Sequence, residues 1–383
     1  MSPKLQQPMT PKKRVSTALN LGKPDRVPVV PNLTPISCAH LLNWPQAKIA
    51  ADTNVALESM IKVYEKFGPF DGVNPAVCCT VNSLLLQGHK VKIPGKDLPE
   101  DVPWQMMEEE ILKFEDYDKI LEMGPTKFWQ QELVFRTSNE IKTQQDVTKL
   151  LKAETGFYLK SYSEWYKRDT VPMIGGGGSH PFFVLSLTRS MVKFTEDLYY
   201  HPDKVEKVIA RMAKEYVPTW IKICNATGVK MAFFCEERAS AAIYPLRMFE
   251  RFWWPYTKQM VDELWSHGIR SWFHLDMCWD KNLSYFLELP KGSAVIALDG
   301  TTDIFKAKEV LGGHLCIAGD VHPSLLSLGK PEDVKTYCEK LIDVVGGDGG
   351  FILSSGCEVP YACKPENLRA MVETGKNYEL SKC

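Results

Sequence analysis

The sequence lacks any run of about 18 apolar residues, has no apolar core segment within residues 1–20, and shows no excess of one charge sign. We therefore expect neither a membrane-spanning helix nor a secretory signal peptide. The chain carries 46 Lys and Arg against 47 Asp and Glu. Its basic cluster Lys12-Lys13-Arg14 is too short to form a nucleic-acid footprint. The expected functions therefore include neither nucleic-acid binding nor membrane binding.

The sequence also lacks the even, regular cysteine spacing of a disulfide framework, because its 11 Cys are irregularly placed along 383 residues. A chain of this length buries enough apolar surface to fold without cross-links. We expect free thiols in a reducing cytoplasm, most of them small core residues and one or two of them metal ligands.

Neither a linker nor a clean internal repeat divides the chain. Residues 1–25 are polar and rich in Pro and Lys, and they predict an N-terminal arm that ends in a short helix. Residues 26–383 predict one α/β domain, a (β/α)8 barrel with N-terminal helical additions. In its first half we expect a helix at 54–67, a hairpin at 88–94, and two strands, at 26–31 and 70–77.

From about residue 170 the pattern becomes regular, and alternating strands and helices predict βαβ units with a parallel sheet. The expected strands lie at 229–236, 271–278, 293–299, 314–320 and 350–355. Near-continuous apolar runs such as Ser293 to Leu298 indicate strands buried on both faces. Each strand ends in a polar or acidic residue, and the active site of a (β/α)8 barrel lies at these carboxyl ends.

The segment Phe273 to Cys278 holds the strongest group of reactive side chains. If the whole segment is a strand, then His274, Asp276 and Cys278 share one face, because side chains alternate with period two. Such a row is costly to bury without a partner, which indicates ligands of a transition metal. The same pattern also fits a core histidine that is hydrogen-bonded to its acidic neighbour.

Cys357 follows the expected strand at 350–355 and lies in a turn of small residues, so its thiol could reach the same pocket. Three protein ligands and one open position are typical of catalytic zinc. An ordinary loop cysteine is the alternative.

Glu236 and Glu237 end another strand, and adjacent residues face opposite ways, so one of them should enter the barrel. We favour Glu237, as a fourth ligand, a partner for His274, or a general acid. The alternative is a salt bridge to Arg238 or Arg251.

Gly175 to Gly178 predict a turn after a strand, at which the backbone lies close to a large ligand or partner. The turn lacks the ending of a P-loop and the spacing of a dinucleotide fingerprint. A plain turn is the alternative. Strand-end or turn positions supply the expected substrate-binding residues, which are Asn32, Asn74, His180, Phe182, Asp299 and Asp320.

Several segments resemble the uroporphyrinogen decarboxylase superfamily. They are residues 14–31, 174–212, 244–264 and 349–371, and the resemblance is weakest from about residue 80 to 165. The decarboxylase carries an arginine-rich substrate loop at its start. The corresponding stretch here, Pro31 to Ser37, contains no arginine, which argues against decarboxylation.

The corrinoid-dependent methyltransferase branch of that superfamily holds zinc with a His-x-Cys pair on a strand and a late Cys. His274 and Cys357 match two of these positions, whereas the middle position is Asp276. The resemblance implies that Asp276, Cys278 or Glu237 completes the zinc site. His274, Asp276 and Glu237 are the expected catalytic residues.

A site with fewer thiolates leaves zinc a harder Lewis acid, which suits cleavage of a methyl ether. We therefore expect methyl transfer from a small donor, such as a methoxylated aromatic in O-demethylation, to the Co(I) corrinoid of a partner protein. The chain has no corrinoid-binding Asp-x-His-x-x-Gly motif, so the cobalamin should be carried by that partner.

Three other functions are compatible with the sequence. They are a methyl-corrinoid:thiol methyltransferase of the coenzyme M type, a decarboxylase, and a barrel that binds without catalysis. The donor, the direction of transfer and the oligomeric state, for which a homodimer is one option, are left open by the sequence.

Overall fold

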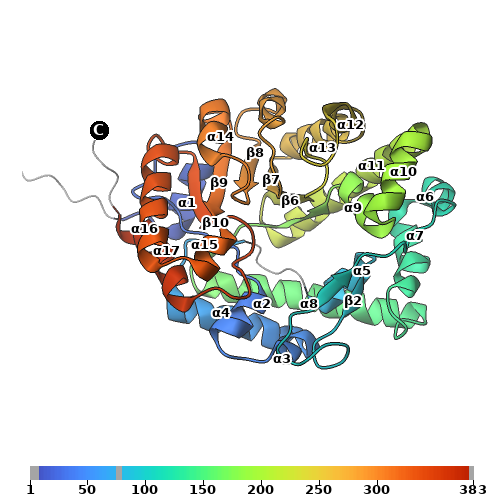
Figure 1. The fold of residues 1–383 in the computed structure, drawn as a ribbon, viewed down its shortest axis with the longest axis horizontal. Coiled ribbons are helices and arrows are strands. Elements are labelled where there is room, and N and C mark those ends of the chain that lie inside the picture. Colours follow the sequence, from blue (N-terminus) through green and yellow to red (C-terminus); the bar gives the residue numbers. More distant parts are fainter. Residues whose placement is uncertain (1–7, 75–79, 379–383) are drawn as a thin grey trace, which may run out of the picture.

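The core of the protein is a parallel sheet wrapped by helices (Figure 1). The computed structural model describes residues 8–74 and 80–378. Six strands pair in the order β10-β9-β8-β7-β6-β5. Their bounds are β5 Gly176–Ser179, β6 Met231–Glu236, β7 Arg270–Leu275, β8 Ala294–Leu298, β9 Cys316–Val321 and β10 Phe351–Ser355. All neighbouring pairs in this sheet are parallel.

Backbone hydrogen bonds continue the sheet beyond its β10 edge. The Val30 N–H donates to the Leu353 carbonyl of β10 (2.9 Å), and the Asp71 N–H donates to the Val29 carbonyl (2.9 Å). β1 (Gly72–Val73) pairs with β4 (Val171–Pro172), which leads into β5. Parallel segments are thus joined in chain order, as the (β/α)8 fold expected from the sequence requires.

Helices that follow the strands cover the outside of the sheet, and their apolar residues recur with helical spacing. In Figure 1, α14, α16 and α17 lie outside β9 and β10, while α11 and α13 lie beside β6 and β7. The bounds are α9 Pro181–Thr188, α10 Met191–Tyr200, α11 Pro202–Thr227, α12 Leu246–Phe252, α13 Trp254–Ser266, α14 Ile304–Leu311, α15 Pro323–Leu328, α16 Pro331–Lys340 and α17 Pro365–Asn377. A 3₁₀ helix spans Leu283–Glu288 and a π-helical turn spans Leu341–Val345.

The first half of the chain adds helices around this core. Their bounds are α1 Pro11–Leu19, α2 Pro35–Leu41, α3 Gln46–Ala51, α4 Thr53–Phe67, α5 Val81–Leu86, α6 Asp116–Met123, α7 Pro125–Gln131 and α8 Gln144–Lys167, with a 3₁₀ helix at Leu133–Arg136. Between α5 and α6, β2 (Lys90–Lys92) pairs antiparallel with β3 (Gln105–Met107). Across the described parts of the chain, none of the helices is long and apolar enough to cross a membrane.

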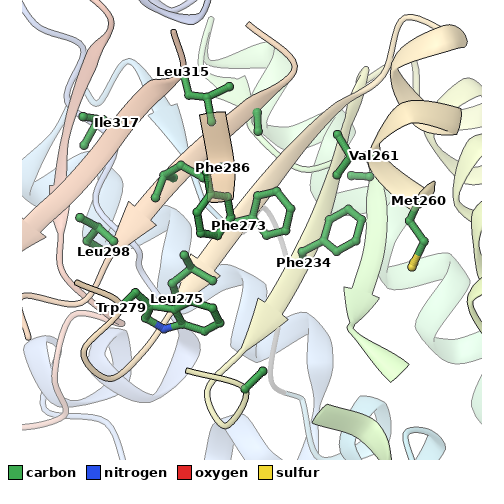
Figure 2. Packing of buried hydrophobic residues seen from close by; sticks show 14 of the residues in the cluster. Phe234, Met260, Val261, Phe273, Leu275, Trp279, Phe286, Leu298, Leu315 and Ile317 are labelled. Atoms are coloured by element: carbon green, nitrogen blue, oxygen red, sulfur yellow. The ribbon is translucent and has the colours of Figure 1, made fainter. Parts of the chain in front are cut away.

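Alternating residues of the strands face two separate cores. On β7, Phe273 and Leu275 pack toward the helices, where Figure 2 shows Phe273 beside Phe286. Trp272 instead faces an inner cluster, in which Val15 of α1 is also buried. This period-two division is what places His274 on the inner face of β7.

The five strands expected beyond residue 170 are present as β6 to β10, with their ends shifted by at most three residues. The helix expected at 54–67 is α4. The hairpin expected at 88–94 is wrong in its second strand, because β2 pairs with β3. The strand expected at 26–31 contributes one bridge, from Val29, and the strand expected at 70–77 runs partly outside the described residues.

Two local predictions about the barrel mouth are wrong. The strand expected to include Cys278 ends at Leu275, because Met277 has a φ of 70°, in the left-handed region. The turn expected at Gly175 to Gly178 is largely strand β5. Gly177 has a φ of +111°, and a Cβ there would lie 2.2 Å from the Phe233 nitrogen of β6. The glycine allows close packing against the neighbouring strand.

Candidate metal centre

Three side chains with metal-binding atoms meet at the carboxyl ends of β7 and β10. His274 Nε2 lies 3.5 Å from Cys357 Sγ and 3.5 Å from Asp276 Oδ1. Cys357 Sγ lies 3.9 Å from Asp276 Oδ2. One ligand atom from each residue lies within 4.8 Å of the others. The structure therefore brings together one nitrogen, one oxygen and one sulfur from segments about 80 residues apart in sequence.

The parallel sheet explains why these segments meet. His274 is the second-last residue of β7, and Cys357 follows β10 by two residues. The Asp276 N–H donates to the carbonyl of Glu236 at the end of β6 (3.3 Å), and the Gly356 N–H donates to the carbonyl of Val321 at the end of β9 (2.9 Å). Each ligand loop is thus anchored to the end of a neighbouring strand.

Asp299, which follows β8, fixes the turn after Asp276. Its Oδ2 accepts the Met277 N–H at 2.9 Å, and the Thr302 hydroxyl donates to the Met277 carbonyl at 3.1 Å. These bonds hold Met277 in its left-handed conformation, which would otherwise be strained for a residue with a side chain. Residues that follow the next strand, β8, therefore orient the Asp276 side chain toward His274 and Cys357.

Asp299 also contacts the second ligand loop through its backbone. A Cβ at Gly356 would lie 2.3 Å from the Asp299 carbonyl oxygen, so only glycine fits beside it. The Ser355 hydroxyl donates to the Cys357 carbonyl at 2.8 Å. The loop that carries the thiol is thus packed directly against the loop after β8.

The charges of the three side chains depend on one another. Burial opposes protonation of His274, but the neighbouring Asp276 and Cys357 outweigh it and raise the pKa of His274 well above its usual value. Burial acts to raise the pKa of Asp276, yet the His274 imidazole holds that pKa below its usual value. Burial raises the pKa of Cys357, and His274 offsets part of this. Asp276 and Cys357 would therefore offset the cost of burying a cation in this cluster.

The donor set fits a zinc ion. Asp276 Oδ1 is buried and accepts no hydrogen bond within the described residues, although it lies at ion-pair distance from His274. Such an oxygen is costly unless a cation or a proton satisfies it. Imidazole, thiolate and carboxylate are all ordinary zinc ligands, and three of them leave a fourth position open.

Glu236 and Glu237 lie in different surroundings. Glu236 accepts the N–H groups of Arg238 (2.9 Å) and Ala239 (3.1 Å) and the indole N–H of Trp253 (2.7 Å). Its carboxylate is fully buried, and burial raises its pKa to about 8. Glu236 is therefore a structural acceptor that organises the loop after β6.

Glu237, unlike Glu236, interacts electrostatically with Asp276 and His274 of the cluster. Burial, with repulsion from Asp276, raises its pKa to about 7, while His274 and Arg238 act in the opposite direction. Its carboxylate is not part of the group within 4.8 Å, which in the described chain contains His274, Asp276 and Cys357. Cys278 also lies outside that group, since the turn at Met277 redirects the chain.

Two of the expected substrate-binding residues lie at strand ends with unsatisfied side chains. The Asn32 N–H donates to Ser355 Oγ (3.1 Å), and its carbonyl accepts the Val359 N–H (2.8 Å), so Asn32 borders the Cys357 loop. Asn32 Oδ1 and Asn74 Oδ1 are buried and accept no hydrogen bond from any described residue. Both are suited to contact a bound molecule.

The other four have side-chain partners within the fold, although the second ring nitrogen of His180, Nε2, is buried without a hydrogen-bond partner among the described residues. His180 caps α9 by accepting the Phe182 N–H at 3.1 Å, and the Phe182 ring packs among Phe194 and Tyr244. Asp299 holds the turn described above. Asp320 Oδ1 accepts the Tyr337 hydroxyl at 2.7 Å.

Sequence reasoning missed the supporting residues Thr302, Ser355 and Gly356. Each follows or ends a strand, and the polar residues after β8 and within the Ser354-Ser355-Gly356 run were available as signals. Their partners belong to other strands, however, so the chain pattern alone did not assign them.

A family model described as uroporphyrinogen decarboxylase (URO-D) matches residues 10–378. Among curated proteins, a methylcobamide:CoM methyltransferase MtbA from Methanosarcina acetivorans is 28% identical over 178 residues, which cover 43% of this chain and 50% of the relative. A uroporphyrinogen decarboxylase from Syntrophotalea carbinolica is 24% identical over 213 residues, which cover 53% of this chain and 59% of the relative. The chain thus spans between half and three fifths of these relatives' lengths.

Among solved structures, a methyltransferase from Methanosarcina mazei superimposes with a TM-score of 0.71 at 15% identity. The match covers 97% of this chain and 99% of that one. At this identity the likeness concerns the fold.

Proposed function

The chain belongs to the uroporphyrinogen decarboxylase family, and from this premise we propose that it is a zinc-dependent methyltransferase. In this proposal, a methyl group moves from a small donor to the Co(I) corrinoid of a separate partner protein. The observation that carries the proposal is the convergence of His274, Asp276 and Cys357 at the carboxyl ends of two barrel strands. This is the edge at which barrel enzymes place their chemistry.

His274, Asp276 and Cys357 would hold the metal. Bound zinc would supply a Lewis acid that stabilises the negative charge developing on the leaving atom of the donor. The chain holds these ligands in place beforehand, because Asp299 fixes the turn after Asp276 and Gly356 packs against Asp299. Little reorganisation is then needed when the donor binds.

We propose a methyl ether of an aromatic ring as the donor. Asp276 occupies the middle ligand position, at which the methyltransferase branch has a cysteine. A carboxylate there would leave zinc a harder Lewis acid than a thiolate would, and a harder Lewis acid suits an oxygen leaving group. In the proposed reaction the methyl–oxygen bond would break with its electron pair left on oxygen, and the reduced corrinoid of the partner would supply the electron pair for the new bond to the methyl carbon. The carboxyl of Glu237, with a pKa raised to about 7 by burial, is suited to deliver the proton that the departing phenolate requires.

A second candidate is transfer from a methylated corrinoid to a thiol. The similarity to a protein named methylcobamide:CoM methyltransferase favours it. Decarboxylation is less well supported, although some relatives carry that name. The stretch Pro31 to Ser37 contains no arginine that could bind a substrate with several carboxylates.

The test is a methyl-transfer assay with the zinc-loaded protein, a reduced corrinoid protein and 2-methoxyphenol. We expect methylcobalamin to form, detected by its absorbance, and at least a 100-fold slower reaction in Asp276→Ala, since that variant loses a metal ligand. Methyl transfer from methylcobalamin to a thiol, without any reaction of 2-methoxyphenol, would establish the second candidate instead.

A further inference from the structure

A second concave site lies on the other side of β5 from the metal centre. It is a cavity of about 310 Å³ between α5, α7 and α8 on one side and β5, α9 and α11 on the other. The cluster residues His274, Asp276 and Cys357 are not among the residues that line it. Its volume is at the lower end of the range for small-molecule pockets, which is enough for a molecule with one ring.

The register of the strands relates the two sites. Ser179 of β5 lines the cavity and pairs with Cys235 of β6, which in turn pairs with His274 of β7. Two strand spacings therefore separate the backbone of the cavity wall from that of the metal ligand, which is about 10 Å. Among the described strands of its sheet, β5 pairs with β6 alone, and Gly177, Gly178 and Ser179 of β5 line the cavity.

The lining combines aromatic and apolar side chains with uncharged polar ones, such as Gln130 and Ser179. The rings of Trp129, Trp220 and Tyr216 contribute to its walls, and none of the described residues that line it is Asp, Glu, Lys or Arg. A charged ligand would lose part of its hydration here without gaining an opposite charge from the lining itself. Flat aromatic walls favour a flat, uncharged ring.

One buried polar side chain faces this space without a partner. His89 lines the cavity, is 6% exposed, and its ring forms no hydrogen bond or ion pair within the described residues. Burial, assisted by nearby Arg238, lowers the pKa of His89 to about 4, so the imidazole is neutral near neutral pH. A neutral imidazole offers one donor and one acceptor, and it pairs well with a hydroxyl group.

We infer that this cavity binds an uncharged single-ring phenol, with its ring against the indole walls and its hydroxyl on His89. The inference goes beyond the proposed function and needs no metal. A phenol would also be the product if the proposed ether donor is correct. The cavity would then bind a molecule of the same class as the product, about two strand spacings from the proposed metal centre.

The structure offers a variant that adds a side chain to the cavity wall at a position with room for a Cβ. At Gly178 of β5, an added Cβ meets only the Trp220 ring within 4 Å, at 3.9 Å. Gly178 lines the cavity and its φ is outside the positive range, so Gly178→Val suits the strand and projects toward Trp220. Gly156→Val is the matched control, because Gly156 is exposed on α8 and an added Cβ meets nothing within 4 Å.

The experiment is calorimetric titration of phenol into chelator-treated, metal-free protein. We expect saturable binding to wild type and to Gly156→Val with the same Kd. Binding should weaken at least 10-fold in Gly178→Val and about 5-fold in His89→Phe, which loses one hydrogen bond. Circular dichroism melting identifies any variant that fails to fold, and His89→Phe then tests the site independently.

The inference is overturned if wild type shows no saturable phenol binding, or if folded Gly178→Val and His89→Phe bind phenol as wild type does. Loss of binding in His274→Ala would place the phenol at the metal centre and overturn it as well. Because all titrations use metal-free protein, these outcomes are independent of whether the chain binds zinc.

Discussion

At the scale of single residues, the candidate metal centre consists of groups that would each be costly to bury alone. His274 is 7% exposed, and its high pKa is possible because Asp276 and Cys357 surround it. Removing one member of such a buried group leaves the others without compensation. The three residues therefore form one unit, in which a metal ion can replace the proton that the imidazole otherwise holds.

Asp320 is a second buried carboxyl, and it makes stability depend on pH. Burial raises its pKa from 3.8 to about 7. The folded state thus holds a proton that the unfolded state releases, so this contribution to stability is lost as pH rises toward 7. Between about pH 5 and pH 8, we expect wild type to lose on the order of 3 kcal/mol relative to Asp320→Asn. Urea unfolding of both proteins at the two pH values measures this, and an unchanged difference would contradict it.

At the scale of elements, the sequence pattern predicts which segments form strands and helices, but it does not predict where each strand ends. The apolar runs of β6 to β10 and the apolar spacing of α4 are local properties, and both predictions are confirmed. The end of β7 depends on a hydrogen bond from Met277 to Asp299, 22 residues away. No local pattern contains that partner, so Cys278 was predicted to face the site.

The candidate site was predictable to a similar extent. His274 and Cys357 followed from the polar residues at strand ends, and the third ligand was left open among Asp276, Cys278 and Glu237. The structure places Asp276 in the cluster because its loop is fixed from β8. Whether these residues bind zinc stays a prediction.

The contact between the two ligand loops can be tested at Gly356. In Gly356→Ala, the added Cβ would lie 2.3 Å from the Asp299 carbonyl and must displace one of the loops. We expect zinc affinity to fall at least 10-fold while the melting temperature changes little, since the loop lies at the barrel mouth. Competition with a chromophoric zinc chelator measures the affinity, with Gly156→Ala as the control. Equal affinity in both variants would show that the contact does not position Cys357.

At the scale of the whole molecule, the first helix packs against the inner face of the sheet. Val15 of α1 is buried in the cluster that contains Trp272 of the inner strand face. Arg14 is 4% exposed and forms ion pairs with Asp71 (2.6 Å) and Asp25 (2.7 Å). We propose that residues 26–383 form the one domain predicted from the sequence, and that α1 seals it at the end opposite the metal centre.

Deletion of residues 1–25 tests this arrangement. It would expose the inner cluster and leave buried Asp71 with Arg26 as its ion-pair partner. The combined loss should exceed about 5 kcal/mol, comparable with the whole stability of many domains. We expect the shortened chain to be largely unfolded by circular dichroism at room temperature. A shortened chain with the melting temperature of wild type would show that the segment is dispensable.

The most direct test of the central claim is the zinc content of the purified chain by elemental analysis, alongside Cys357→Ala and Cys278→Ala. Cys357 belongs to the cluster, whereas Cys278 lies outside it. We predict about one zinc per chain in wild type and in Cys278→Ala, and a loss of most of it in Cys357→Ala. Absence of zinc from wild type, or full retention in Cys357→Ala, would contradict the assignment of this barrel as a zinc-dependent methyltransferase.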